Sequence, residues 1–200
     1  MDYQLYSNKS DELFIAFHGT GGNLYSLLPI VGEINPQADV LSFLGDCETG
    51  VSRRFFPILK DGYISTDELK KHAQKFLDQF ATFDLSHYKR ITAIGFSNGA
   101  NFLLSIMQLD PNFAPEIYLL HSFDFDYDFK DEVSTSRILA TVGVSDTMVA
   151  PGSIVQMHKR MSERLFPNFT LKLLDEEHGV TDIEIEYLKE FYGGQLTSLI

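Results

Sequence analysis

RITAIGFSNGA, residues 90–100, is the stretch that decides the fold. Its first part, from Arg90 to Gly95, is a short and mostly apolar run of the kind that forms a buried parallel strand. Helical spacing of apolar residues begins at Asn98 and continues to Leu109. The pattern G-x-S-x-G therefore lies between a strand and a helix, where a sharp turn raises the hydroxyl of Ser97 above the sheet. The alternative is a glycine-rich turn with an incidental serine.

The rest of the chain repeats this alternation of strand and helix. Short apolar runs predict buried strands at residues 13–17, 39–43, 116–122, 137–143 and 169–175. Helical spacing lies between them at residues 24–34, 66–83, 153–166 and 181–191. We therefore expect an α/β fold in which residues 1–200 form a single domain, with a mostly parallel sheet and helices on both faces. The short connection between residues 122 and 137 leaves no room for a large helical lid, and the apolar tail at residues 195–200 is expected to pack against the domain.

Charge and cysteine content narrow the class of protein. The chain carries a formal net charge of −12, which opposes binding to nucleic acid or to anionic membranes. Its single cysteine, Cys47, forms no internal disulfide, and the polar start of the chain is unlike a secretion signal. We predict a cytoplasmic protein whose partner is a small molecule, with no nucleic acid and no membrane involved. The sequence leaves open whether two copies form a homodimer.

A serine hydroxyl becomes a good nucleophile only when a base takes its proton, so a histidine held by a carboxylate is expected. Asp146 follows the strand at 137–143, and His178 follows the strand at 169–175. Both therefore lie on the same rim of the sheet as Ser97, in the chain order Ser, Asp, His. Taken singly, Asp146 could be a turn or cap residue and His178 a solvated histidine. His18 and His121 also end strands, and we expect them to have structural or supporting roles.

The loop His18-Gly19-Thr20-Gly21-Gly22-Asn23 follows the strand at 13–17. Its glycines allow a backbone amide, that of Thr20, to point into the site as one donor of an oxyanion hole. The amide of Asn98, at a helix N-terminus, is expected to be the other donor. Asn23 is interpreted as a helix N-cap. The spacing of glycines matches neither phosphate-binding pattern, and we predict no cofactor and no metal.

Three residues before the helix at 66–83 are candidate substrate-binding residues. Arg54, Phe55 and Phe56 would give a pocket an aromatic wall and a guanidinium. The alternative is ordinary core packing with an internal salt bridge. Cys47, in the same region, is interpreted as an ordinary loop thiol.

Taken together, the motifs HGTGGN, GFSNGA, GVSDTMVAP and EEHGVTDIEIEYLKEF resemble those of the phospholipase/carboxylesterase family of α/β hydrolases. This family includes small bacterial carboxylesterases and acyl-protein thioesterases. The segment RRFFP, followed by STDEL, resembles most the bacterial branch linked to hydroquinone and quinone stress. The chain departs from the family at Asn98, Thr147 and Glu177, where the family often has Gln, Pro and Gly.

The resemblance implies a serine hydrolase that cleaves small carboxylic esters through an acyl-enzyme on Ser97. It implies Ser97, Asp146 and His178 as the catalytic triad, with the amides of Thr20 and Asn98 as the oxyanion hole. Three alternatives stay open with the same motifs. They are a thioesterase or lysophospholipase, a lactone or carbon–carbon hydrolase, and a hydrolase-like binding or sensing domain without turnover.

Overall fold

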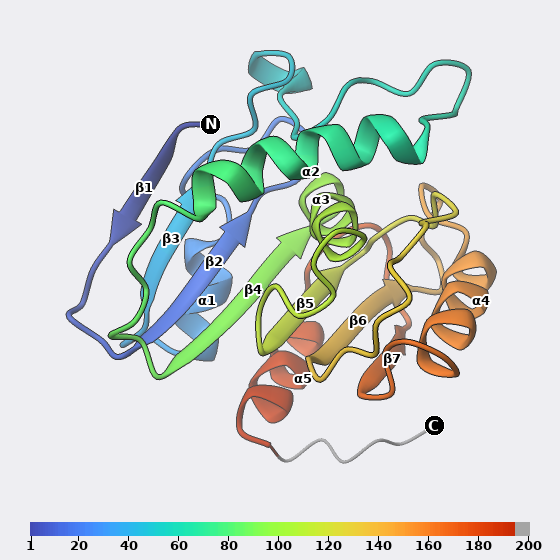
Figure 1. The fold of residues 1–200 in the computed structure, drawn as a ribbon. Helices are drawn as coiled ribbons and strands as arrows, with labels where there is room; N and C mark the ends of the chain where they lie inside the picture. The colour runs from blue at the N-terminus through green and yellow to red at the C-terminus, as the bar shows by residue number, and fades with distance from the viewer. Residues whose placement is uncertain (195–200) are drawn as a thin grey trace.

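The computed structural model describes residues 1–194, which form one seven-stranded sheet with helices on both faces (Figure 1). The expected packing of the tail at residues 195–200 lies outside the described residues. The strands are β1 (Tyr3–Tyr6), β2 (Glu12–Phe17), β3 (Asp39–Phe43), β4 (Arg90–Phe96), β5 (Glu116–Leu120), β6 (Arg137–Gly143) and β7 (Phe169–Leu174). The helices are α1 (Leu28–Ile34), α2 (Thr66–Phe80), α3 (Asn98–Met107), α4 (Pro151–Ser162) and α5 (Asp182–Tyr192), with a 3-10 turn at Gly50–Ser52.

The sheet has the order β1-β3-β2-β4-β5-β6-β7, and all pairs except β1 with β3 are parallel. The six predicted strands are confirmed, because continuous apolar runs are what a strand covered on both faces requires. The sequence analysis missed β1. This edge strand pairs antiparallel with β3, for example Tyr3 with Phe43, and most of its residues are exposed.

Alternate residues of the central strands pack into two separate hydrophobic cores, one on each face of the sheet. Leu13, Ile15 and Phe17 of β2 pack with α2, α3 and α4 on one face. Phe14 and Ala16 of the same strand pack with α1 and α5 on the other. In Figure 1, α2 and α3 cross in front of the sheet and α1 and α5 lie behind it. The predicted arrangement of helices on both faces is therefore confirmed.

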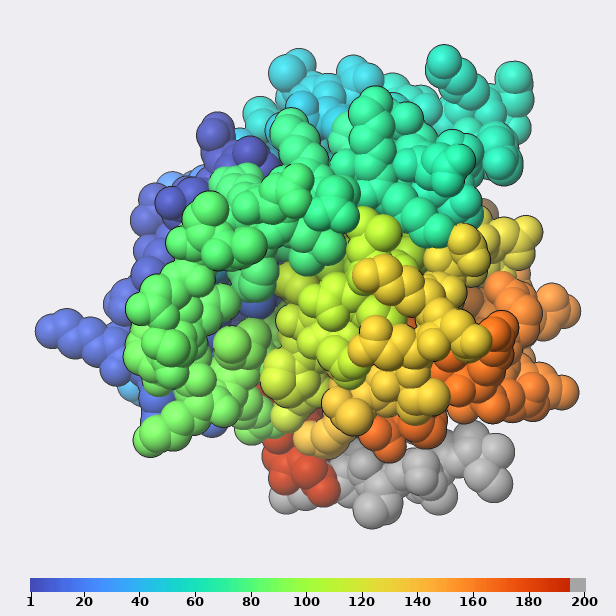
Figure 2. All heavy atoms as spheres, in the orientation of Figure 1, coloured from blue at the N-terminus to red at the C-terminus, as the bar shows by residue number. Residues whose placement is uncertain are grey.

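The connection between β5 and β6, residues 121–136, contains no helix. Figure 2 shows it in yellow, spread over the front face of the molecule between α2 and α4. A large helical lid is absent from the described residues, as the short connection predicted. Among the same residues, no helix has the length and apolar character that crossing a membrane requires.

The first helix begins later than predicted. Residues 24–27 form turns, and α1 starts at Leu28 with a proline in its first turn, where the fixed φ of proline suits a helix start. The interpretation of Asn23 as an N-cap is therefore wrong. Its Oδ1 accepts hydrogen bonds from Tyr25 N at 2.8 Å and from Ser26 Oγ at 3.5 Å, which is a local turn. A proline likewise starts α4, at Pro151 rather than residue 153.

Candidate active site

Ser97 occupies the sharp turn between β4 and α3. Its backbone has φ 50° and ψ −111°, a strained conformation for a residue with a side chain. The turn is held by Ser97 N, which donates to Leu120 O at 2.8 Å. A Cβ at Gly99 would lie 2.0 Å from Phe17 O, and one at Gly95 would lie 2.6 Å from the Gly99 carbonyl carbon. Glycine at position 99 therefore allows the turn to pack against the end of β2, and glycine at position 95 allows β4 to pack closely against the start of α3.

The structure brings Ser97, His178 and Asp146 together. His178 Nε2 lies 3.0 Å from Ser97 Oγ, and His178 Nδ1 lies 2.7 Å from Asp146 Oδ2. The His178 side chain is 13% exposed, whereas that of Asp146 is fully buried. These distances let Asp146 fix the tautomer of His178 whose Nε2 can accept the proton of Ser97.

The carboxylate of Asp146 is held from several sides in the turn after β6. Its Oδ1 accepts hydrogen bonds from Met148 N at 2.8 Å and from Val149 N at 2.9 Å. Burial opposes ionisation of this carboxyl, but the hydrogen bonds from Val149 and His178, among others, outweigh burial and lower its pKa. The side chain is therefore a buried anion at neutral pH.

The glycine loop after β2 is fixed by the segment that follows β3. Gly21 N donates to Arg53 O at 2.9 Å, and His18 Nε2 accepts from Gly45 N at 3.0 Å. Burial lowers the pKa of His18, which keeps this imidazole neutral and able to accept. His18 thus has the structural role expected of it. Thr20 N makes no hydrogen bond within the described part of the chain, so it is free to bind an oxyanion.

Asn98 makes a structural side-chain contact that the sequence analysis did not identify. Its backbone N–H is the first of α3 and has no intrahelical partner, as an oxyanion donor requires. Its buried side chain accepts a hydrogen bond from Phe55 N at 2.9 Å. Asn98 therefore ties the segment after β3 to the serine turn, a long-range contact that leaves no local sequence signal.

The two phenylalanines proposed to bind substrate lie elsewhere. Phe55 is 0% exposed and Phe56 1% exposed, and Phe55 stacks on Phe102 of α3 with ring centres 4.9 Å apart. Both rings fill the core between the loop and the helices, so the expectation that they line a pocket is wrong for this structure. Arg54 stays near the glycine loop, with Nη2 3.5 Å from Thr20 Oγ1.

A different pair of aromatic residues lies beside His178. Phe123 and Phe125 stack with centroids 5.8 Å apart, and the Phe123 ring is 6.1 Å from that of His178. Both are partly buried on the segment after β5. The signal in the sequence was the alternation of aromatic and acidic residues in FDFDYDF, because an alternating segment presents the aromatic residues to one side.

Two clefts adjoin His178. One, of about 510 Å³, is lined by the glycine loop and by apolar side chains that include Leu27, Ile30, Phe96 and Val180. The other, also about 510 Å³, is lined by acidic residues that include Asp175, Glu176 and Glu177. The first cleft offers an apolar surface next to His178, which suits the hydrocarbon part of an ester.

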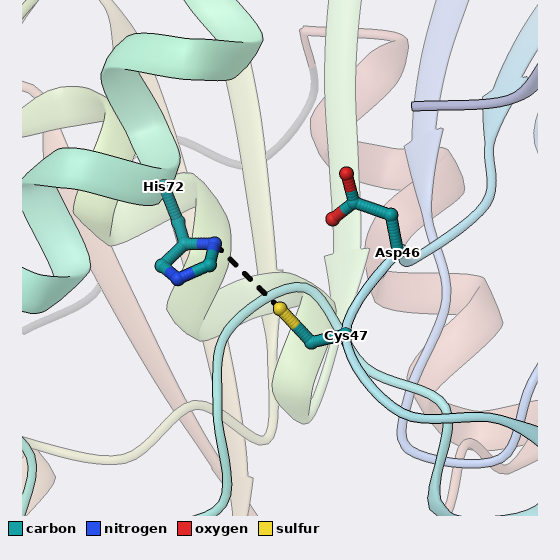
Figure 3. A group of neighbouring side chains, drawn as sticks. All are labelled: Asp46, Cys47 and His72. Atoms are coloured by element: carbon teal, nitrogen blue, oxygen red, sulfur yellow. Dashed lines mark hydrogen bonds between the residues drawn. The ribbon is translucent and has the colours of Figure 1, made fainter.

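Two groups of side chains in the described residues are close enough to hold a metal ion. One is His121 with the triad residues Asp146 and His178, and the other is Asp46, Cys47 and His72 (Figure 3). In the second group Cys47 Sγ lies 3.6 Å from His72 Nδ1, while Asp46 pairs with Lys75 Nζ at 2.7 Å. Burial and the Asp46 carboxylate raise the pKa of the Cys47 thiol. A protonated thiol is a poor metal ligand and a poor nucleophile, which agrees with an ordinary loop thiol.

Comparisons with known proteins identify the fold. The Bacillus cereus carboxylesterase structure has 25% identity and a TM-score of 0.84, covering 98% of this chain and 95% of that one. A carboxylesterase from Mesorhizobium loti, at 20% identity and covering 96% and 94% of the two chains, has a TM-score of 0.83. The chain has the α/β-hydrolase fold.

A structural neighbour of lower identity is acyl-protein thioesterase 2 of Zea mays. The two share 13% identity, with a TM-score of 0.75 and coverage of 97% and 98%. In sequence, the Bacillus subtilis (strain 168) protein named "Putative hydrolase MhqD" is 33% identical over 101 residues. That match spans 49% of this chain and half the length of MhqD. No family model matches the chain. The resemblance to carboxylesterase-type hydrolases is confirmed, and the MhqD match agrees with the bacterial branch that RRFFP indicated.

Proposed function

We propose that this α/β hydrolase is a serine carboxylesterase that cleaves small carboxylic esters, with Ser97, His178 and Asp146 as its catalytic triad. The observation that carries the proposal is the hydrogen-bonded chain Ser97 Oγ, His178, Asp146, with separations of 3.0 Å and 2.7 Å. The carboxylesterase relatives support the same reaction class.

The reaction proceeds in two halves. Ser97 Oγ attacks the ester carbonyl carbon while His178 Nε2 takes the hydroxyl proton, and the carbonyl oxygen becomes an oxyanion bound by the amides of Thr20 and Asn98. The tetrahedral intermediate collapses, the bond to the alcohol oxygen breaks, and His178 returns the proton to that oxygen. Water then attacks the acyl-enzyme with His178 again as base, which frees the acid and restores Ser97. Each step uses side chains and backbone amides alone, so we propose no cofactor and no catalytic metal.

The apolar cleft beside His178 and the absence of a large lid among the described residues support a small or flexible acyl ester as substrate. The single cysteine and the net charge of −12 support a cytoplasmic location without nucleic-acid partners. The position of the half-buried Arg54 beside Thr20 supports a contact with the polar part of a substrate.

The decisive test is the Ser97→Ala variant assayed with p-nitrophenyl acetate. Loss of the nucleophile should lower turnover by about 10⁶-fold, since the triad residues act as a unit. A fluorophosphonate probe should label the parent protein and leave the variant unlabelled. Equal hydrolysis by parent and variant would refute the assignment of Ser97.

A panel of substrates separates this proposal from its alternatives. Short-chain esters, thioesters, lysophospholipids and lactones would be compared by kcat/KM with the same enzyme preparation. Preference for a short-chain ester supports the carboxylesterase, and preference for another class assigns the same triad to that class. A protein that binds these compounds, hydrolyses none and resists fluorophosphonate would instead be a binding or sensing domain.

A further inference from the structure

A second imidazole, that of His121, contacts the same Asp146 oxygen to which His178 is hydrogen-bonded. His121 Nδ1 lies 3.2 Å from Asp146 Oδ2, and His121 Nε2 lies 3.2 Å from Glu184 Oε2. The side chains of His121, Asp146 and Glu184 have no exposed surface. Asp146 Oδ2 therefore lies within hydrogen-bonding distance of two histidines, one of which the proposed mechanism does not use.

The protonation of His121 follows from the chemistry of its partners. A neutral imidazole has one N–H and one lone pair, so one of its two contacts would set that lone pair against a carboxylate oxygen. An imidazolium donates at both nitrogens, and it compensates two buried carboxylates that would otherwise face each other with no cation between them. Burial alone would lower the pKa of His121, but the carboxylates of Glu184 and Asp146 outweigh it and raise the pKa.

The backbone and the surrounding elements hold this ring in place. His121 has φ 52°, in the left-handed region that side chains seldom adopt, and its N–H donates to Thr141 O at 3.0 Å. The far carboxylate, Glu184 of α5, also accepts a hydrogen bond from Thr141 Oγ1. The ring centres of His121 and His178 are 5.3 Å apart, and Phe96 packs against both. A strained backbone at a buried polar residue is typical of a functional position.

We propose that His121 is a positioning residue: held as an imidazolium between Glu184 and Asp146, it fixes the Asp146 carboxylate for His178 and sets the pH above which the enzyme turns over. The charged and titratable groups that face it are Asp146 from the turn after β6, Glu184 from α5, and His178 from the segment after β7. The link to turnover rests on the triad proposed above, whereas the charge state of His121 does not.

The sign of the effect follows from the charges. His178 must be neutral to act as a base, and a positive His121 nearby disfavours a second positive charge on His178. Removing the His121 charge therefore favours protonated His178 and moves the acid limb of kcat/KM to higher pH. Two unit charges 5.3 Å apart, at an effective dielectric constant of about 20 to 40, give a shift of roughly 1 to 2 pH units.

The first experiment reads the charge directly, by ¹⁵N NMR of the histidine rings in the full chain at pH 8, with His121→Gln used for assignment. Both ring nitrogens of His121 should be protonated, although a free histidine is neutral at that pH. A ring with one unprotonated nitrogen overturns the proposal. Because this measurement needs no turnover, it stands even if Ser97→Ala shows the triad assignment to be wrong.

The second experiment compares the pH profile of kcat/KM in the parent, His121→Gln, and the double variant His121→Gln with Glu184→Gln. The acid limb should move up by about 1 to 2 pH units in the single variant. It should move less in the double variant, because the negative charge of Glu184 is removed together with the positive charge of His121. If the single variant fails to fold, the pH profile of the double variant is compared with that of the parent instead.

His158→Gln is the matched control, since His158 on α4 bonds to Phe169 O at 2.9 Å, away from the triad. Its acid limb should coincide with that of the parent. A fall in kcat/KM that is equal at every pH, with no movement of the limb, would show a merely structural role for His121 and overturn the proposal.

Discussion

Replacing Asn98 by Ala tests whether the serine turn depends on the segment after β3. The side-chain oxygen of Asn98 is the acceptor for Phe55 N at 2.9 Å, and both residues are buried. The variant leaves that N–H without a partner away from water, which costs about 1 to 3 kcal/mol. In a chain of this size, a loss of about 2 kcal/mol lowers Tm by roughly 4 to 8 °C. Activity should fall as well, because the same segment holds Gly21 of the glycine loop.

The assay is urea unfolding followed by kcat/KM on a short-chain ester. Asn98→Asp keeps an oxygen acceptor and should recover much of the midpoint lost in Asn98→Ala. Asn23→Ala is the matched control: its Oδ1 also accepts a backbone N–H, from Tyr25 at 2.8 Å, but the site is exposed and water replaces the bond. Its effect should stay within about 0.5 kcal/mol. An Asn98→Ala protein with the parent's midpoint and activity would refute the reasoning.

Four further variants test separate parts of the structure. Burial alone would raise the pKa of Asp39, but hydrogen bonds from Ser10 N and other groups outweigh burial and lower this pKa in the folded protein. Ionised Asp39 therefore stabilises the fold above about pH 4, the pKa of an unfolded aspartate, and this stabilisation is lost as the pH falls through the lower pKa of the folded state. Asp39→Asn should therefore unfold at lower urea than the parent at pH 7, and an unchanged gap between them on acidification to pH 3 would contradict this. Cys47→Ser should keep turnover within a few-fold, and a loss of 10³-fold or more would make the thiol essential. Phe123→Ala should raise KM for esters of aromatic acids more than KM for acetate esters. Equal changes in the two KM values would show that Phe123 does not contact the substrate. Gly99→Ala places a Cβ 2.0 Å from Phe17 O, so little folded protein should be recovered, and a parent-like Tm would show that the turn can shift.

The strands could be predicted from the sequence where both faces of the strand are buried. A strand such as β6, buried on both faces, is a continuous apolar run, and its bounds at Arg137 and Gly143 agree with the prediction. The edge strand β1 has the sequence YQLY and is mostly exposed, so neither a continuous run nor a full alternation distinguishes it from a loop. It is stabilised by pairing with β3, which sequence periodicity does not report.

The candidate site likewise contains residues that the sequence could predict and residues that it could not. Ser97, Asp146 and His178 could be found because each follows a predicted strand, and the carboxyl ends of parallel strands meet at one rim. Phe55 could not be placed, because an aromatic residue in a loop packs in a core or lines a pocket with the same local sequence. The contact of His121 with Glu184 joins positions 63 residues apart, and no motif encodes it.

Four loops form the site, and close backbone contacts at Gly99 and Gly143 join them into two pairs. At Gly99 the serine turn packs on Phe17 O, at the start of the glycine loop, so the turn that carries Ser97 and the glycine loop are held to one another. At Gly143 a Cβ would lie 2.2 Å from Glu176 O, so the Asp146 turn packs on the segment that carries His178. The hydrogen bond from Ser97 Oγ to His178 Nε2 links the two pairs. His121 follows β5, next to the strand of Ser97, and its contact with Asp146 links them a second time. A substitution at His121 removes a contact between the pairs and leaves the contacts within each pair in place. Because the proposed positive charge of His121 acts on His178 across 5.3 Å, its loss is expected to shift the pH profile more than the stability of the fold.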